Sequence, residues 1–557
     1  RMEYYIEPDT EHEDFIRISS PEEITLCDPA CGSGHILVYA FELLFHMYEE
    51  RGYREREIPE LILTKNLAGM EIDSRAAQIA ELALAMRARE HDRRFFKRAV
   101  RADVTVLSSI PLGDDELPGN KKLAEELSHL GEIGSLLNPS EGEIDELKVA
   151  AANWSDDLFA SATKTKLENT AAICEKLSRR FTCTVANPPY MGSSSFNPFM
   201  SKWVKKNYPD VKSDLFSSFI VRIMDFAGEH GEVGMMTPFV WMFIGSYEKL
   251  RNRLIDDKTL TTLIQLEYSG FAGATVPICT FTYHNSHIDD YKGGYVRLAD
   301  FTGPAVQAPK ALEAIHNPNC GWFYRRDADT FKKIPGTPIA YWVGDSFLLY
   351  CGLDSRLSDF ADVQEGLKTS DNDRFIRHWY EVPYQKTNLQ SSSINAKWVK
   401  HSKGGSYRKW YGNQDEILLF EDGGKALREL KRASLTGQQN YGKKCVSWGR
   451  ITSDLTSFRY YGPGFIPNMA GLALYPKDGD DFLPLLALLN SSIVTEFIKV
   501  TNPTLNVPPG CVSSIPMAKE IDDDASIVTL ARQCIDFSKL DWDSFETSWG
   551  FKRNPLV

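Results

Sequence analysis

Residues 24–35 have the sequence ITLCDPACGSGH, and this stretch decides the expected fold. A short apolar run, Ile24–Cys27, leads into Asp28 and then into two glycines, Gly32 and Gly34. Glycine allows a tight turn and the close approach of another backbone or a ligand. The stretch therefore predicts a strand, a turn and the start of a helix, with a ligand-binding loop between them.

The same alternation continues along the chain. Apolar residues at three- and four-residue spacing predict helices over 36–48 and 74–91. Strands are expected over 66–72, 101–107 and 182–186, followed by a helix over 214–228, a strand over 233–237, a helix over 246–255, a strand over 262–266 and a final strand containing Phe281-Thr282-Tyr283. Strand–helix–strand order predicts an α/β fold with a parallel sheet and right-handed crossovers.

Changes in composition along the sequence suggest how the chain divides into domains. A length of 557 residues gives a prior of about three to four domains. Residues 108–178 are acidic and helical in pattern, so we interpret them as an inserted helical segment. From about residue 300 onward, Gly, Pro, Trp and Tyr become frequent. We expect a first domain over 1–300, a linker over 301–335 and a second, mixed α/β domain over 336–557.

The composition excludes several classes of protein. Hydrophobic residues make up 43% and charged residues 25%, which excludes a wholly disordered or fibrous chain. No apolar run reaches the roughly 18 residues of a membrane helix. The acidic residues 1–15 lack a signal-peptide core. Ten cysteines without a CxxC pair argue against a disulfide scaffold or zinc ribbon, so a reducing cytoplasm is expected. The first residue is Arg, and we expect an interior piece of a longer chain.

Charge is distributed unevenly. The formal net charge of −13 argues against a general nucleic-acid binder. Residues 396–450, however, hold twelve Lys and Arg, five acids and interleaved aromatic residues. This stretch is either a solvated basic surface or a nucleic-acid face. The candidate DNA-binding residues are Lys397, Lys400, Arg408, Lys409 and, in the later loop 457–461, Arg459.

The glycine-rich loop could hold several ligands. A dinucleotide phosphate site expects GxGxxG, but Leu37 stands at the third glycine position, and no Walker lysine follows Gly34. Asp28 would repel a phosphate and suits a cationic ligand. S-adenosylmethionine carries both a sulfonium and an ammonium group. An ordinary glycine turn is the remaining alternative.

Two further strand ends carry acids. Glu71, at the end of the second strand, is suited to accept hydrogen bonds from ribose hydroxyls. Asp73 is expected to cap the following helix. Asp103, in the third strand, could accept a hydrogen bond from the exocyclic amine of adenine, or could be a plain surface aspartate.

The expected strand 182–186 leads into Asn187-Pro188-Pro189-Tyr190. Two prolines force a stiff, extended exit from the strand. The Asn187 side-chain carbonyl and the backbone carbonyl of Asn187 or Pro188 would then form a fixed pair of acceptors. Such a pair can take both protons of one NH₂ group and turn the nitrogen lone pair toward a methyl donor. Tyr190 can stack on the ring that bears the amine.

Together the two motifs resemble those of gamma-type N6-adenine DNA methyltransferases, with the cofactor motif first, the catalytic motif next and target recognition last. More closely, DPACGSGH with its Tyr-Ala-Phe helix, the GMEID strand and the late stretches 489–492 and 502–506 resemble the PglX family of BREX phage-defence methyltransferases and the related single-chain Type IIG restriction-methylation enzymes. The resemblance covers most of the chain and is densest at 24–104 and 181–285.

This resemblance implies a Rossmann-like class I S-adenosylmethionine-dependent methyltransferase domain with a helical insertion, followed by a mixed α/β target-recognition domain. The implied cofactor-binding residues are Asp28, Ala30, Cys31, Gly32, Gly34, Glu71, Ile72 and Asp103, and the implied catalytic residues are Asn187, Pro188, Pro189 and Tyr190. Tyr283, with Phe281 second, would pack on the flipped base, although both could equally be core aromatics.

The implied reaction transfers a methyl group from S-adenosylmethionine to N6 of an adenine flipped out of duplex DNA. The implied partner is double-stranded DNA, with other phage-defence proteins as further candidates; neither a membrane nor a metal is expected. The implied location is the cytoplasm, at the nucleoid when DNA is bound.

Two departures and several rivals accompany this hypothesis. The cofactor-wall motif usual in such enzymes is not recognisable in residues 1–23, and we find no PD-ExK-like nuclease constellation. A protein glutamine methyltransferase also uses NPPY but lacks a large second domain, and an N4-cytosine enzyme usually has Ser at the position of Asn187. Two more rivals are a DNA-recognition component with little turnover and the methyltransferase part of a Type IIG enzyme.

Overall fold

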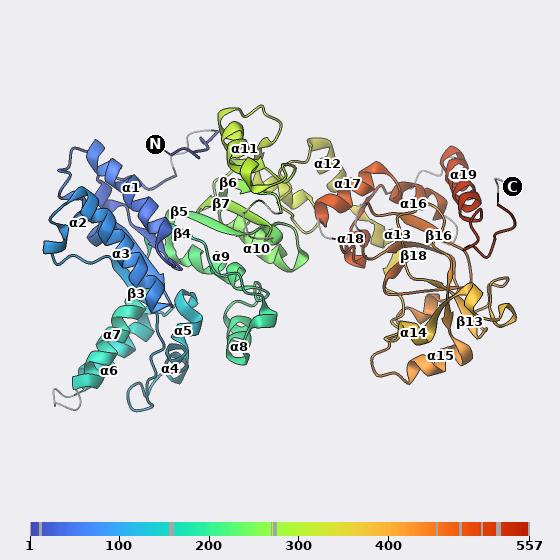
Figure 1. Ribbon diagram of the computed structural model, residues 1–557, viewed down its shortest axis with the longest axis horizontal. Helices are drawn as coiled ribbons and strands as arrows, with labels where there is room; N and C mark the ends of the chain where they lie inside the picture. The colour runs from blue at the N-terminus through green and yellow to red at the C-terminus, as the bar shows by residue number, and fades with distance from the viewer. Residues whose placement is uncertain are drawn as a thin grey trace. The chain divides into compact units, whose positions relative to one another are not determined.

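The computed structural model describes residues 2–9, 14–154, 161–268, 270, 276–452, 455–477, 482–502, 505–519 and 525–554 (Figure 1). The chain divides into two compact units, described separately below. The first comprises Arg1–Lys332 with Ile339–Trp342, and the second Lys333–Pro338 with Val343–Val557. Pro503 and Thr504 of the late motif lie outside the described residues.

Nine strands of the first unit form one sheet in the order β3-β2-β1-β4-β5-β7-β6-β8-β9. They are β1 (Leu26–Asp28), β2 (Leu67–Glu71), β3 (Asp103–Val106), β4 (Phe181–Ala186), β5 (Ala227–Pro238), β6 (Thr259–Gln265), β7 (Ile278–His284), β8 (Lys292–Arg297) and β9 (Phe323–Asp327). Strands β3, β2, β1, β4 and β5 pair in parallel, whereas β7 runs antiparallel to both of its neighbours, β5 and β6. The expected α/β fold is thus confirmed, but the sheet is mixed and not parallel throughout.

Both faces of the parallel part are covered by helices. On β2, Leu67 packs in one apolar cluster with α1 (His35–Glu50) and α3 (Ser74–His91). Its neighbour Ala68 points to the other face, into the cluster that includes α9 (Leu215–Phe226) and α10 (Glu248–Asp256). Alternate residues of a strand point to opposite faces, so a strand buried on both faces is apolar throughout.

Helices fill the expected insertion between β3 and β4. They are α4 (Lys121–Ser128), α5 (Leu130–Ile133), the 3₁₀ turn η4 (Gly134–Leu136), α6 (Glu141–Asn153) and α7 (Ser161–Ser178), with α6 and α7 side by side in Figure 1. Buried Arg222 joins this insertion to α9. Its guanidinium donates to the backbone carbonyls of Ser135, Leu137 and Leu177 at 2.9, 3.0 and 2.5 Å. Burial lowers the pKa of Arg222 to about 10, still well above neutral pH.

Two expectations about the later part of this unit are corrected. The strand that contains Phe281 is not the last, because β8 and β9 extend the sheet beyond β6. Residues 301–332 are not a linker: they form α11 (Pro304–His316), β9 and the 3₁₀ turn η8 (Ala328–Lys333). Aromatic residues of this segment fill that end of the core: Trp322 packs edge-on against Phe301, with ring centroids 5.0 Å apart.

The second unit is mixed α/β with three small sheets, of orders β11-β18-β15-β16, β12-β14-β13-β17 and β10-β19. Its strands are β10 (Ser355–Arg356), β11 (Ala361–Gln364), β12 (Ile376–His378), β13 (Trp398–Ser402), β14 (Glu416–Leu419), β15 (Cys445–Gly449), β16 (Phe458–Tyr461), β17 (Phe465–Pro467), β18 (Gly471–Pro476) and β19 (Pro516–Met517). Its helices are α12 (Asp345–Cys351), α13 (Leu357–Phe360), α14 (Asn372–Phe375), α15 (Glu421–Arg428), α16 (Phe482–Leu489), α17 (Ser492–Thr501), α18 (Pro509–Ser513) and α19 (Ala525–Trp542).

Among the helices of the described residues, none is by itself long and apolar enough to cross a membrane. Only α16 and α17 taken together meet that criterion, and they are bent by 60° at the break between them.

The glycine-rich loop permits a sharp test of this packing. Gly34 has φ +83°, and a Cβ there would lie 2.9 Å from Cβ and 3.0 Å from Cα of Ala80 on α3. Gly32 also has a positive φ, +52°, but a Cβ there would meet nothing within 4 Å. We expect Gly34→Ala to lower the free energy of unfolding by about 2–4 kcal/mol and Gly32→Ala by only about 1 kcal/mol, measured by urea denaturation. Equal destabilisation of the two variants would contradict the close approach of α1 to α3.

Candidate active site

Strand β1 ends at Asp28, whose side chain is only 1% exposed. Its carboxylate Oδ1 accepts a hydrogen bond from the Ala30 amide at 3.1 Å, which fixes the start of the glycine-rich loop. Burial, with a smaller contribution from the charge of Glu71, raises the pKa of Asp28 to about 7. A carboxyl group held under the loop in this way can gain or lose a proton near neutral pH.

Glu71, at the end of β2, closes the loop from the other side. Its Oε2 accepts from the Gly32 amide at 2.8 Å, and its Oε1 accepts from the amides of Ile72 and Asp73 at 2.8 and 2.9 Å. A carboxylate offers about four lone-pair positions, so three are used and one stays available for a ligand hydroxyl. Asp73 caps α3, as expected, through the Arg75 amide.

Strand β4 leads directly into the Asn187–Tyr190 motif. The Tyr190 hydroxyl lies 3.0 Å from Oδ1 of Asn187 and 3.2 Å from the Met236 carbonyl of β5. Burial raises the pKa of Tyr190 to about 12, so its hydroxyl stays protonated and can donate to the asparagine. Pro188 is buried, whereas the side chains of Asn187 and Tyr190 are exposed. The motif therefore presents an oriented amide and an aromatic ring at the surface of the first unit.

Asp214, the residue that caps α9, holds the chain that follows Tyr190. Its Oδ1 accepts from the amides of Met191 and Phe216 at 3.1 and 3.2 Å. The Leu215 amide also donates to the Met191 carbonyl at 3.0 Å. These bonds attach the exit of the motif to a buried helix, so the prolines are held rigidly at both ends.

The loops after β1, β2 and β4 line one cavity of about 560 Å³. Its lining residues are Pro29, Ala30, Glu71, Ile72, Leu107, Glu132, Ile133, Gly134, Ser135, Leu136, Asn187, Pro189, Met191, Ser195, Phe196, Asn197, Met200, Leu215 and Phe219. The volume lies in the range of small-molecule sites, and the lining is largely apolar with a few polar groups, as is usual for them. The expected cofactor residues Ala30, Glu71 and Ile72 thus share a cavity with Asn187 and Pro189.

Other expected cofactor residues lie beside or beneath this cavity. Cys31 is buried behind the loop, and its amide donates to the Met70 carbonyl at 3.0 Å. Asp103 is not part of the lining: its carboxylate accepts a hydrogen bond from Lys176 of α7 at 2.5 Å and lies 3.9 Å from Arg179. Asp103 therefore joins β3 to the helical insertion in this structure.

The structure offers no support for the expected base-packing aromatics as surface groups. Tyr283 is fully buried and Phe281 is 1% exposed. They belong to β7, which lies inside the sheet, and Phe281 packs against Trp241 with ring centroids 4.9 Å apart. Neither ring has a face open to a base. Both are core aromatics, which was the alternative that the sequence left open.

The five candidate DNA-binding residues are also engaged within their own unit. Arg459 is 1% exposed and donates to the Arg408 carbonyl at 3.2 Å, and Lys400 is 8% exposed and donates to the Pro463 carbonyl at 2.9 Å. Lys397 pairs with Glu421 at 2.8 Å, Arg408 with Asp541 at 3.0 Å, and Lys409 donates to the Asn490 carbonyl at 2.7 Å. The prediction that Lys400 and Arg459 contact DNA is therefore wrong, because buried cations cannot reach a phosphate.

The sequence did not reveal the second wall of the cavity. Ile133–Leu136 of the insertion, Phe196 and Met200 around α8 (Pro198–Asn207), and Leu215 and Phe219 of α9 complete the lining. The sequence predicted the helical insertion and the helix over 214–228 but not α8, and no pattern distinguishes a side chain in a core from one that faces a ligand.

Comparison with known proteins agrees with the resemblance of the motifs. A family model described as Eco57I restriction-modification methylase matches residues 65–271. The adenine-specific methyltransferase PglX of Lacticaseibacillus casei (strain Zhang) is 32% identical, over 96% of this chain and 47% of that protein. The adenine-specific methyltransferase BrxX of Escherichia coli O9:H4 (strain HS) is 33% identical, over 100% of this chain and 49% of that protein. The chain spans about half the length of the curated relatives it matches.

Solved structures agree on the fold. The Type IIL restriction-modification enzyme MmeI, in complex with DNA, aligns with a TM-score of 0.53 at 12% identity, over 96% of this chain and 68% of that one. A nuclease-deletion mutant of the Type ISP restriction-modification enzyme LlaGI, with a DNA substrate mimic, gives 0.52 at 12% identity, over 93% and 44%. At this identity the likeness shows the fold alone.

The raised pKa of Asp28 predicts a pH dependence of stability. The folded protein keeps a proton up to about pH 7, whereas the unfolded chain releases it near the ordinary carboxyl pKa of 3.8. The stabilisation is therefore complete below pH 4 and is lost as the pH rises to about 7. We expect the difference in unfolding free energy between the wild type and Asp28→Asn to fall over this window, in urea titrations from pH 4 to 8.

Asp73 provides the control. The Arg75 amide lowers the pKa of Asp73, so its contribution is present above the ordinary carboxyl pKa and is lost only in more acidic solution. Asp73→Asn should therefore leave the profile between pH 4 and 7 unchanged. A wild-type profile parallel to that of Asp28→Asn over the same window would show that Asp28 is ionised in the folded protein.

Proposed function

We propose that the chain, a relative of the adenine-specific methyltransferases PglX and BrxX of which it spans about half, transfers a methyl group from S-adenosylmethionine to N6 of an adenine flipped out of duplex DNA. One observation carries this proposal: Ala30 and Glu71 of the cofactor loops and Asn187 and Pro189 of the catalytic motif line the same cavity. A donor and an acceptor can react directly only if one site holds both.

The residues of the cavity fit S-adenosylmethionine. Glu71 retains one lone-pair position for a ribose hydroxyl after its three backbone hydrogen bonds. Ile72 and Phe219 supply apolar surface for an adenine ring, and the acids Glu71 and Glu132 favour a cationic ligand. When bound, S-adenosylmethionine supplies an electrophilic methyl group on its sulfonium.

Asn187 and Pro188 would hold the target amine. The Tyr190 hydroxyl donates to one lone pair of Asn187 Oδ1, which leaves the second for a proton of the adenine N6 amine. The Pro188 carbonyl would accept a hydrogen bond from the other N–H of the amine. The Tyr190 ring, 38% exposed, would stack on the base. Catalysis then consists of positioning and of carbonyl polarisation by fixed groups, with no covalent enzyme intermediate.

The second unit would recognise the DNA sequence, but through residues other than those first expected. Exposed cations gather at the end of α15 and just beyond it: Lys425, Arg428, Lys431 and Arg432. Phosphate contacts from such side chains set the position of a protein on a duplex, and their number sets the salt dependence of binding. We assign the phosphate-binding surface to these four residues.

The relatives' names also suggest the setting. PglX and BrxX support a role in BREX phage defence, and the Eco57I model supports the restriction-modification alternative. The proposed location is the bacterial cytoplasm, at the nucleoid when DNA is bound, with other defence proteins as further partners. Sequencing of modified bases in host DNA separates adenine from cytosine methylation and gives the recognition site.

Substitution of Asn187 tests the catalytic assignment. We expect Asn187→Ala to lower methyl transfer to plasmid DNA by about 100-fold or more, because one of two fixed acceptors is removed, while calorimetry shows unchanged binding of S-adenosylmethionine. The control is Asn138→Ala, an exposed asparagine that bonds Asp225 away from the cavity and should keep full activity. Specific DNA binding by the wild type without methyl transfer would favour a recognition component instead.

Charge reversal tests the DNA surface. Lys431→Glu with Arg432→Glu should weaken duplex binding and reduce the slope of log K against log salt by about one for each phosphate that the variant no longer neutralises, with cofactor binding unchanged. The matched control is Lys552→Glu with Arg553→Glu, an exposed Lys-Arg pair elsewhere in the second unit. Equal effects of the two double variants would indicate only non-specific electrostatic attraction.

A further inference from the structure

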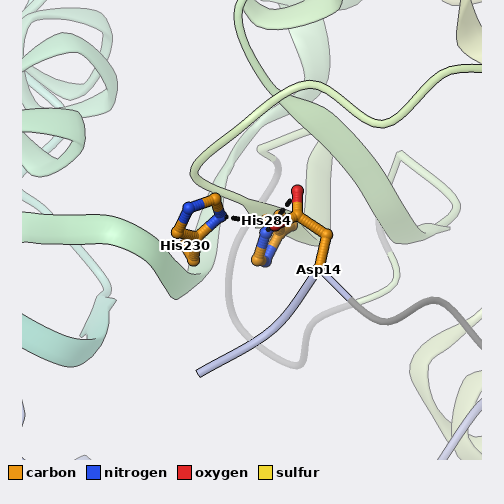
Figure 2. A group of neighbouring side chains, drawn as sticks. All are labelled: Asp14, His230 and His284. Carbon is orange, nitrogen blue, oxygen red and sulfur yellow. Dashed lines mark ion pairs between the residues drawn. The ribbon is translucent and has the colours of Figure 1, made fainter. Parts of the chain in front are cut away.

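Asp14, His230 and His284 converge in the first unit (Figure 2), and none of the three lines the cavity. One potential ligand atom from each residue lies within 4.8 Å of the other two. Asp14 Oδ1 is 2.8 Å from His230 Nδ1, and Asp14 Oδ2 is 3.9 Å from His284 Nε2. Two imidazoles and a carboxylate are a common ligand set for divalent transition metals.

The chain is distorted to bring His230 into this group. On β4 only one residue separates Phe181 and Cys183, the partners of Ala227 and Glu232, so the segment 228–231 bulges out of β5. Within this bulge His230 adopts a φ of +59°, which is uncommon for a residue with a side chain. Bulges often serve to redirect one side chain, and here the redirected imidazole lies against Asp14.

His284 provides a second, independent observation: one of its ring nitrogens is buried without a hydrogen-bond partner among the described residues. It ends β7 and is 2% exposed. Its Nδ1 is 2.8 Å from Glu232 Oε1, but its Nε2 is buried and has no hydrogen-bond partner among the described residues. Buried polar atoms nearly always have a partner, and this one faces the Asp14 carboxylate at a distance too long for a hydrogen bond.

We propose that Asp14, His230 and His284 bind one divalent transition metal ion, with Zn²⁺ as the best fit. His284 would coordinate through Nε2, while Glu232 accepts the proton of Nδ1 and so fixes the tautomer, as carboxylates do around zinc histidines. Ser286, whose hydroxyl is 3.2 Å from Asp14 Oδ2, would orient the carboxylate. Three protein ligands leave the fourth tetrahedral position to water.

Metal binding requires a shift of the Asp14 carboxylate. Ligand atoms about 2.0–2.2 Å from a tetrahedral zinc lie roughly 3.3 Å from one another. Here the three potential ligand atoms lie within 4.8 Å of one another, and the 2.8 Å and 3.9 Å contacts of Asp14 run from its two different oxygens. Asp14 is partly exposed and can move, whereas His284 is fixed by burial and by Glu232.

Its place in the sheet separates the proposed site from the cavity. Glu232 pairs with Cys183 in the middle of β4, whereas the catalytic motif follows Ala186, which pairs with Met235. His230 and His284 are therefore at the amino end of the parallel strands, and the cavity is at the carboxyl end. The metal would join the early segment that contains Asp14 to β5 and β7, and it would play no part in methyl transfer. We expected no metal because the implied methyl transfer needs none. That argument concerns the cavity and does not apply to a site outside it.

Cobalt and zinc titrations of the full chain test the proposal. After removal of metals by a chelator and dialysis, we expect one Co²⁺ per chain, with the visible absorption of a tetrahedral nitrogen-oxygen site and without the intense near-ultraviolet band of cysteine ligation. Zn²⁺ should displace the Co²⁺ and raise the Tm by several degrees. Elemental analysis gives the stoichiometry independently of activity.

Substitutions locate the site. Asp14→Asn and His230→Ala change partly exposed side chains and should each weaken Co²⁺ binding by about 100-fold or more without unfolding the protein. Glu232→Gln should weaken it by about 10–100-fold. His46→Ala removes a surface histidine that pairs with Glu49 and should leave binding unchanged. Absence of stoichiometric binding, or binding that persists in the Asp14→Asn/His230→Ala double variant, overturns the proposal.

Discussion

The parallel pairing of β1 with β4 is the constraint on which the rest of the first unit depends. Leu26 pairs with Cys183 and Cys27 with Thr184, so two segments more than 150 residues apart in the sequence end at one edge of the sheet. At the start of the pair, the Thr25 amide donates to Thr182 Oγ1 at 2.8 Å and the Thr182 amide to Thr25 Oγ1 at 3.0 Å. These reciprocal bonds fix the register, and a slip by one residue would turn Asp28 to the other face.

The helical insertion converts this edge into an enclosed site. Ser135 donates its hydroxyl to the Pro29 carbonyl at 2.5 Å, and its own carbonyl accepts from Arg222 at 2.9 Å. The insertion is therefore bonded both to the glycine-rich loop and to α9. Loss of either bond would leave buried polar groups unpaired, so the wall and the loop are held as one piece. The shape of the cavity is therefore set jointly by the insertion, by α8 and α9, and by the strand-end loops that carry its polar groups.

Local motifs predicted the polar part of the site, and three-dimensional context decided the rest. Asp28 and Glu71 end strands and Asn187 follows one, and the carboxyl ends of parallel strands meet at one edge, so the sequence was sufficient to place these three residues there. Tyr283 differs because an aromatic residue in a strand has the same local pattern whether the strand is central or at an edge, and β7 is central. Arg459 differs because a charge count treats every cation as exposed, although this one is buried among backbone carbonyls that it bonds.

Strand β5 runs from the proposed metal site, at the amino end of the parallel strands, to the cavity at their carboxyl end. Its pairing explains why a metal at the first end would change stability but not the chemistry at the second. Just after the bulge, Glu232 accepts from His284, and near the end of the strand the Met236 carbonyl lies 3.2 Å from the Tyr190 hydroxyl. Between them the strand is paired on both sides, with β4 and with β7. A strand held by two ladders has no second arrangement to adopt, and coupling between distant sites requires an element with two states. A metal at the bulge would therefore raise the free energy of unfolding and leave the position of Tyr190 unchanged.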